Sequence, residues 1–187
     1  MEVKKYMGIY WTLQRLEAWV QFEKQGYLEG NPEHAVYGKE YDWMKAQMKL
    51  RLPNYNGEQP IWLWPKKPDM RSTGHFRGNT GCVRITVELD EKDVLMSDFE
   101  EWHIVLNNGF NANNEQEFDD FYNNKLAITK EDSWGRIFDI HKERDPEWDG
   151  VSEVWLQGVT GRISLSKVKK VEHFVTRTSA LEKCMNE

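Results

Sequence analysis

Alternation of apolar and polar residues predicts the strands of this chain. The clearest strand is predicted at residues 82–89, whose apolar face is formed by Val83, Ile85, Val87 and Leu89. Short runs rich in β-branched and aromatic residues predict further strands at 7–13, 60–65, 151–158 and 163–165. Residues 166–175 have apolar positions three apart, which is compatible with a strand or with a turn followed by a strand.

Apolar residues that recur every three or four positions predict the helices. This period indicates helices at 15–25, 37–50, 115–126 and 131–140, and one more that begins at residues 97–98. We expect Ser97 to cap that last helix, because Glu100 three residues later completes a capping box. In the acidic helix 115–126, the residues expected on the inner side are Phe118, Phe121 and Tyr122.

The order of these elements indicates the fold class. Strands lie at both ends and in the middle of the chain, and helices are grouped between them, which predicts an α+β domain rather than a regular βαβ repeat. A length of 187 residues suits one domain, which we place at residues 1–175. Residues 176–187 are expected to form a mobile C-terminal tail.

Two tryptophans stand at alternate positions between Pro60 and Pro65. Because alternate residues of a strand share a face, Trp62 and Trp64 are expected side by side, with their apolar neighbours pointing the other way. Two interpretations are open for these rings. Both fill the core, as large aromatic side chains commonly do, or one lines a pocket and stacks on a flat ligand.

A long polar connection follows this strand, at residues 66–81. It has no apolar period, and it carries a surplus of basic residues that includes Arg71. Connections of this length in compact domains are often functional. The segment is either a solvated loop or a flap that meets an anion such as a phosphate group.

Composition narrows the classes of partner. The net charge of −6 disfavours nucleic acid or an anionic membrane surface as the main partner, because both require clustered Lys and Arg. Two cysteines, Cys82 and Cys184, do not make a disulfide framework, so a cytoplasmic location is expected. Neither a signal peptide nor a membrane-spanning run is recognisable.

Strong catalytic signatures are absent from the sequence. Phosphate-binding glycine loops, nucleophile elbows and zinc motifs do not occur, and the five histidines lack metal-ligand spacing. We therefore expect no metal and no resident cofactor. Two carboxylate pairs, Glu100–Glu101 and Asp119–Asp120, are expected on exposed helix surface. What remains is a set of aromatic and polar residues that suits a flat ring ligand.

Five motifs in a fixed order carry a family resemblance. They are residues 10–14 (YWTLQ), 41–44 (YDWM), 60–64 (PIWLW), 67–71 (KPDMR) and 97–103 (SDFEEWH). Together they resemble a family of small, uncharacterised bacterial and phage proteins known as a domain of unknown function. The resemblance covers residues 9–175 and implies no particular activity.

A second resemblance concerns the fold. A first strand ending in Trp11-Thr12, followed by a helix that ends at Gly26-Tyr27, is similar to the opening of the ADP-ribosyltransferase-like fold. That likeness implies two small, mostly antiparallel sheets with flanking helices, which grip NAD between them. Family members carry Arg or His on the first strand and a catalytic Glu on a late strand. Gln157 stands at the late position here, and an amide does not supply the carboxylate charge.

These observations favour binding of a nucleotide-type small molecule, such as an NAD-derived compound or a cyclic nucleotide, without turnover. We expect Trp62 or Trp64 to stack on the base and Arg71 to meet phosphate. The residues expected to orient the sugar are Thr12, Gln14, Tyr41, His103 and Gln157. One alternative is a divergent ADP-ribosyltransferase or NAD-cleaving enzyme, in which Glu153 or His103 supplies the missing charge.

A second alternative is a protein-interaction module, for example a phage-encoded inhibitor of a host protein. Its docking surface would be the acidic helix at 115–126, because an acidic face steers basic partners.

Overall fold

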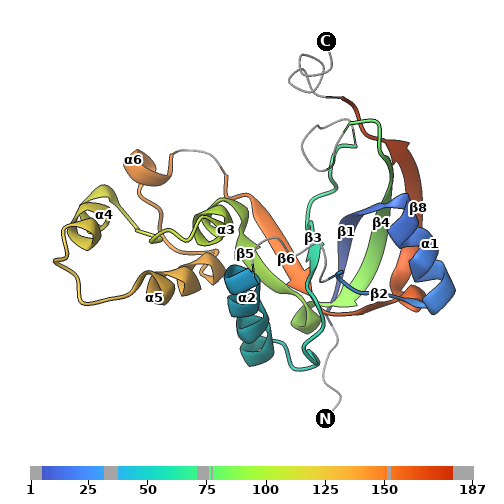
Figure 1. Ribbon diagram of the computed structural model, residues 1–187, viewed down its shortest axis with the longest axis horizontal. Helices are drawn as coiled ribbons and strands as arrows, with labels where there is room; N and C mark the ends of the chain where they lie inside the picture. Colours follow the sequence, from blue (N-terminus) through green and yellow to red (C-terminus); the bar gives the residue numbers. More distant parts are fainter. Residues whose placement is uncertain (1–5, 32–37, 71–75, 77, 151–152, 179–187) are drawn as a thin grey trace.

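A computed structural model describes residues 6–31, 38–70, 76, 78–150 and 153–178. In this part of the chain three small antiparallel sheets gather on one side, and helices α2 to α6 extend to the other (Figure 1). The α+β class with antiparallel pairing is therefore confirmed, whereas the expected number of two sheets is wrong. No described helix has the length and apolarity needed to cross a membrane.

The largest sheet has the strand order β1-β4-β8, formed by β1 (Met7–Arg15), β4 (Gly81–Asp90) and β8 (Val168–Val175). Its central strand β4 confirms the predicted alternation, because all four apolar residues of its expected face are buried. On the opposite face Arg84 is buried too, since Glu172 of β8 and the Pro68 carbonyl oxygen cover it. The ambiguous segment 166–175 is resolved as strand β8 after a 3₁₀ turn at Leu165–Lys167.

The middle sheet has the order β3-β6-β5 and is covered on both faces. It consists of β3 (Ile61–Leu63), β6 (Leu156–Thr160) and β5 (Leu95–Asp98). Ile61 and Leu63 face a first hydrophobic core, whereas Trp62 between them faces a second. The two cores on opposite faces follow from the alternating side-chain directions of a strand.

The first core fills the space between the two three-stranded sheets and helix α1 (Leu16–Gln25). Trp19 and Phe22 of α1 contribute their rings to it. Gly26 ends the helix in the left-handed conformation, with φ of 80°, as its position in the sequence predicts. The chain then enters a two-stranded sheet of β2 (Tyr27–Leu28) and β7 (Ile163–Ser164).

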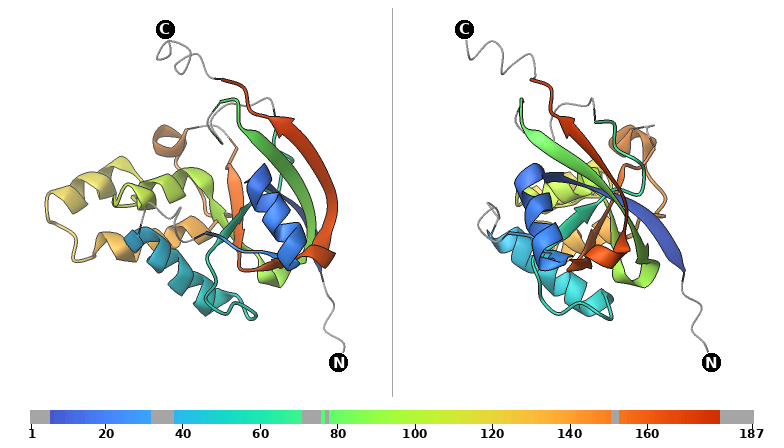
Figure 2. Two further views of the ribbon diagram at one scale, coloured as in Figure 1. Left: turned by 45° about the vertical axis from the view of Figure 1, so that its right-hand side comes forward. Right: turned by 90° about the vertical axis from the view of Figure 1, so that its right-hand side faces the viewer.

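The second core lies between the middle sheet and three helical segments, which Figure 2 shows from two further sides. These segments are α2 (Gly38–Arg51), α3 (Phe99–Leu106) and α5 (Lys130–Trp134), the last continued by a 3₁₀ turn at Gly135–Phe138. The prediction of one uninterrupted helix at 131–140 is therefore wrong. Gly135, a poor helix former, stands where the α-helical hydrogen bonding ends.

Two short helices, α4 (Glu115–Tyr122) and α6 (Pro146–Asp149), lie at the end of the molecule remote from the sheets (Figure 1). Helix α4 ends four residues before the predicted limit of 126, and none of its residues is buried. Phe118 and Tyr122 are exposed, so their expected place on the inner side is wrong. Only Phe121 of that set packs inward, stacked on Phe110 at 3.9 Å between ring centroids.

Two further expectations need correction. Asp98, rather than Ser97, caps α3, because the Asp98 carboxylate accepts hydrogen bonds from the backbone N–H groups of Glu100 and Glu101. Ser97 is a buried residue of β5 instead. The strand predicted at 151–158 is shifted toward the C-terminus, to Leu156–Thr160, and residues 151–152 lie outside the described part.

Candidate functional site

The residues that the sequence nominated for a ligand site are distributed over several places. Thr12 and Gln14 share a face of β1, where the Gln14 side-chain amide donates to Thr12 Oγ1 at 2.8 Å. Thr12 is buried. Arg71 lies outside the described residues, and the expected anion flap at 66–81 is described only in part.

Trp62 of β3 and Trp64, which directly follows the strand, point to the same side, as predicted, and helix α3 contacts both. Trp62 packs on Trp102 at 5.2 Å between centroids, and its indole N–H donates to the Tyr41 hydroxyl at 3.2 Å. Trp64 packs on Phe99 at 5.3 Å. Because Phe99 and Trp102 are three residues apart on one helix, they lie above neighbouring positions of the strand. Both tryptophans are partly buried, and Trp62 belongs to the second core.

His103 is exposed on α3, and its Nδ1 lies 2.8 Å from the Phe99 carbonyl oxygen one turn earlier. Its ring contacts Phe99, which in turn contacts Trp155 at 4.4 Å. Trp155 is 50% exposed. Trp64, Phe99, His103 and Trp155 thus form a surface aromatic group, which we call the Trp155 patch.

Gln157 does not belong to that patch. It is only 4% exposed, and its amide lies 3.4 Å from Ser97 Oγ on the paired strand β5. By strand alternation it shares the face of Val159, which the second core covers. Glu153 is exposed and forms an ion pair with Lys66 at 2.9 Å. The nominated residues within the described structure therefore lie at several places.

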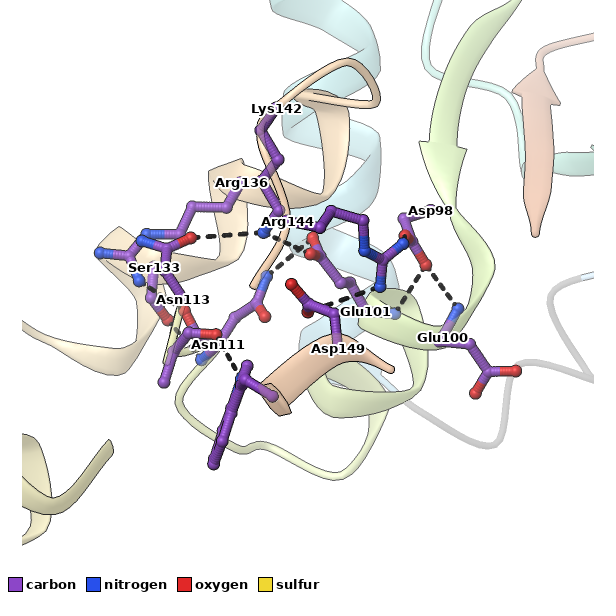
Figure 3. Close-up of polar contacts among 12 residues, drawn as sticks. Asp98, Glu100, Glu101, Asn111, Asn113, Ser133, Arg136, Lys142, Arg144 and Asp149 are labelled. Atoms are coloured by element: carbon purple, nitrogen blue, oxygen red, sulfur yellow. Dashed lines mark hydrogen bonds and ion pairs between the residues drawn. The ribbon is translucent and has the colours of Figure 1, made fainter. Parts of the chain in front are cut away.

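A buried polar cluster stands out instead near α3 (Figure 3). Glu101 is only 5% exposed, so its expected place on exposed helix surface is wrong. Its carboxylate forms an ion pair with Lys142 at 2.5 Å and accepts a hydrogen bond from the Asn111 amide at 3.0 Å. A buried charge is tolerated only when it is paired in this way.

A second ion pair extends the cluster toward α6. The Asp98 carboxylate that caps α3 also binds Arg144 at 3.0 Å, and Arg144 reaches Asp149 of α6 at 3.5 Å (Figure 3). The indole N–H of Trp148 in α6 donates to the Ala112 carbonyl oxygen at 3.2 Å. Helix α6 is therefore held in place although it has only four residues.

Helix α4 is anchored by a third pair. Arg136 binds both carboxylate oxygens of Glu117, at 2.7 and 2.9 Å, and donates to the Asn111 carbonyl oxygen at 2.6 Å. Burial opposes ionisation of Glu117, but the hydrogen bonds from Arg136 and from the Asn113 backbone outweigh it and lower the pKa. The pair is bidentate, so it fixes orientation as well as distance.

These anchors present one continuous surface made of α4 and α6. Phe118 contacts Tyr122 at 4.6 Å and Trp148 at 5.7 Å between centroids, and all three rings are partly open to solvent. Tyr122 is 55% exposed. A hollow of about 520 Å³ adjoins the rings and is lined by Asn114, Glu115, Gln116, Asp145, Glu147 and Trp148. We call the three rings and this hollow the acidic–aromatic face.

The charge of this face has one sign. Glu115, Asp145 and Glu147 line the hollow, and no basic residue does within the part of the chain that the structure describes. Among the described residues, Glu115 and Glu147 have no ion-pair partner. The acidic start of α4 is visible in the sequence, but exposure of Phe118 and Tyr122 is not, because an apolar pair four residues apart equally indicates a buried stripe.

A second hollow, of about 240 Å³, lies between residues 52–58 and 160–167. Its lining mixes both signs of charge, with Glu58 and Asp93 near Arg162 and Lys167. Burial, together with the charges of Glu58 and Glu29, raises the pKa of the neighbouring Tyr55 to about 12. No group of three or more potential metal ligands occurs among the described residues.

Comparison with known proteins assigns a family without an activity. No curated protein and no solved structure matches the chain. One family model, described as "Domain of unknown function (DUF3841)", matches residues 9–156. That span contains the ordered motifs from residue 10 to residue 103, and it also contains α3, α4, α6 and the polar cluster. The chain therefore belongs to the DUF3841 family of uncharacterised domains.

Proposed function

We propose that this protein is a protein-interaction module that binds a basic, partly apolar segment of another protein on its acidic–aromatic face. The observation that carries the proposal is the combination of three solvent-exposed aromatic rings with an acidic hollow in which no described basic residue takes part. Aromatic side chains are enriched at interface hot spots, and exposed apolar groups next to a charged rim are typical of binding surfaces.

The chemistry of the face suits Lys and Arg side chains. A cation that enters the hollow meets the carboxylates of Glu115 and Glu147 and lies beside the Trp148 ring, whose π-face attracts positive charge. The adjoining rings of Phe118 and Tyr122 offer apolar contact to a neighbouring side chain of the same partner. The net charge of −6 favours encounter with basic partners over acidic ones.

Rigidity of the face supports the proposal. Arg136 holds α4 through Glu117, and Arg144 holds α6 through Asp149. A surface ordered before binding loses little conformational entropy on association. A surface that served only as solvated exterior would not require two anchored helices with outward-facing rings.

The experiment is a titration followed by NMR of the tryptophan indole N–H groups, with the Trp148 signal assigned through Trp148→Phe. The probe is a synthetic peptide of alternating Lys and Leu, compared with its Glu and Leu counterpart. We expect the Lys peptide to shift the Trp148 signal, with an affinity that falls as salt rises, because exposed charges are screened beyond about 8 Å at physiological ionic strength. The Glu peptide is expected to cause no shift.

Variants locate the binding. Glu115→Lys combined with Glu147→Lys is expected to abolish the shift, whereas the matched reversal Glu23→Lys on the exposed side of α1 leaves it intact. Tyr122→Ser weakens binding through loss of apolar contact. Equal affinity of the double reversal and the control would exclude the acidic–aromatic face as the binding surface.

A nucleotide-type ligand at the Trp155 patch is a second candidate. One observation favours it, since Trp155 is half exposed and Trp64 and His103 border the same Phe99 ring. This second candidate includes an ADP-ribosyltransferase-like fold and a cytoplasmic location. The free, buried thiol of Cys82 agrees with that location. Titration with NAD, ADP-ribose and cyclic nucleotides should change tryptophan emission in the wild type and leave Trp155→Ala unchanged. The same ligand-induced change of emission in both proteins, or no change in either, would exclude this candidate.

A further inference from the structure

We propose that the outer edge of β8 is a self-association surface, through which two copies of this chain join their β1-β4-β8 sheets into one. Strand β8 has β4 on one side, and no described strand lies on its other side (Figures 1 and 2). An edge of eight residues is a template for a further strand. This proposal is independent of the acidic–aromatic face, since α4 and β8 lie at opposite ends of the molecule (Figure 1).

The hydrogen-bond pattern identifies which residues of β8 face outward. The backbone N–H of Thr176 donates to the Thr80 carbonyl oxygen at 3.0 Å, so residue 176 directs its backbone polar groups toward the segment just before β4. Antiparallel strands alternate these directions residue by residue, so Phe174 and Glu172 also bond to β4. The backbone N–H and C=O groups of Val171, His173 and Val175 therefore point to the open edge.

Strand β1, at the other edge of this sheet, has the hydrogen-bond directions that this alternation requires. Trp11 of β1 directs its N–H and C=O away from β4 and exchanges both bonds with Trp64, at 3.0 and 2.8 Å. Its cross-strand partner on β4 is Thr86, and Thr86 also stands opposite Lys170 of β8. Even-numbered residues of β4 thus bond to β8 and odd-numbered ones to β1. This agrees with an outward direction for Val171 and His173.

Charge along β8 favours a second copy as the occupant, in a register centred on Val171. In a two-fold antiparallel pair centred on Val171, Lys170 of each copy stands opposite Glu172 of the other. Centring on Lys170 or on Glu172 would instead place identical charges opposite each other, and centring on His173 would place Lys169 opposite Arg177. Val171 is also one of the outward-facing residues, so a pair centred on it exchanges both backbone hydrogen bonds at the axis.

A β-bulge between Thr86 and Val87 limits the regular ladder of β8 to its C-terminal part. Bulges and lysines are common devices that restrain edge strands. Lys170, one residue away from the axis, lies 3.1 Å from Glu172 of its own strand, so its charge is already partly compensated. We therefore infer a reversible, concentration-dependent dimer rather than open-ended growth, because a two-fold antiparallel pair buries the β8 edge of both copies in the same contact.

Sedimentation velocity over a wide range of concentrations, combined with hydrogen exchange, tests this inference on the full chain. We expect a monomer–dimer equilibrium in which the amides of Val171 and His173 become protected as concentration rises. The amide of Glu172 bonds within the sheet and is expected to be protected at every concentration. A monomer at all concentrations, or a dimer with unprotected edge amides, would overturn the proposal.

Two variants act on the interface in different ways. Lys170→Glu places like charges opposite each other twice and is expected to weaken association by about tenfold or more. His173→Pro removes an outward N–H, a change that edge strands tolerate, and is expected to weaken association without unfolding. Lys49→Glu, on the exposed side of α2, is the charge-matched control and leaves the dimer intact. Persistence of the dimer in both edge variants would place the interface elsewhere.

Discussion

At the scale of single residues, tight packing in the middle sheet leaves Gly158 little freedom. Gly158 stands opposite Leu63 of β3 and Met96 of β5, at the centre of three strands. A methyl group added there would lie 2.8 Å from Val94 Cγ1 and 3.2 Å from the Met96 sulfur. Val94 is buried and β-branched, so its rotamer cannot relieve the first contact easily.

We therefore predict that Gly158→Ala lowers the free energy of unfolding by about 1–3 kcal/mol, the usual cost of overpacking a core. Gly81→Ala in β4 is the matched control, because its new methyl group would meet nothing nearer than Leu16 at 3.9 Å. That variant is expected to lie within about 0.5 kcal/mol of the wild type. Urea denaturation measures both, and equal effects would contradict the packing argument.

At the scale of elements, an ion pair joins β4, β8 and the segment after β3. Glu172 of β8 accepts two hydrogen bonds from Arg84 of β4, at 2.9 and 3.1 Å, and also binds Lys170 and Lys67. Arg84 in turn donates to the Pro68 carbonyl oxygen. The hydrogen bonds from Arg84 and then Lys170 lower the pKa of Glu172 to about 2.

Because the pKa of Glu172 is lowered, the contribution of its ion pair to the free energy of unfolding depends on pH. The folded state favours the carboxylate, so the contribution is complete above the unfolded pKa of about 4.3 and is lost as pH falls toward about 2. We predict that Glu172→Gln lowers the unfolding free energy near neutral pH, and that its difference from the wild type shrinks across that acidic window. Urea denaturation at several pH values measures this difference in unfolding free energy. A difference that does not change with pH would contradict a lowered pKa of Glu172.

Several elements were predictable because their signal is local. The alternation in β4, the shared face of Trp62 and Trp64, and the glycine that ends α1 each depend on residues within a few positions. The cap of α3 shows the limit of that reasoning. Ser97 and Asp98 are adjacent and both suit a cap, but Ser97 continues β5 opposite Gln157, which leaves Asp98 to begin the helix.

At the scale of the whole molecule, the middle sheet separates two cores, and α4 lies beyond both. Helix α4 depends on the Arg136–Glu117 pair and on the stacked rings of Phe121 and Phe110. Few buried contacts hold it, so its local unfolding should require less free energy than unfolding of the sheets. Substitutions on the acidic–aromatic face are therefore expected to leave the fold of the sheets intact.

We predict that Arg136→Met speeds amide exchange in residues 115–122 and leaves exchange in β4 unchanged. Arg162→Met is the matched control, because Arg162 also makes two hydrogen bonds to a carboxylate, Glu29, but at the opposite side of the middle sheet. Hydrogen exchange read by mass spectrometry distinguishes the two variants. Unaltered exchange in α4 would show that the helix is held by its ring contacts alone.

The sequence by itself determined the α+β class, most strands and helices, and the family, because each of these is recorded in local periods or in ordered motifs. Tertiary structure decided which polar groups are buried and which apolar groups are exposed. Glu101 becomes internal only because Lys142 and Asn111 reach it from outside its helix, and Gln157 only because the second core covers its strand face. Phe118 and Tyr122 remain exposed because α4 lies beyond both cores, although Trp148 of α6 contacts Phe118. Burial and exposure thus depend on segments far along the chain, and local patterns do not carry that information.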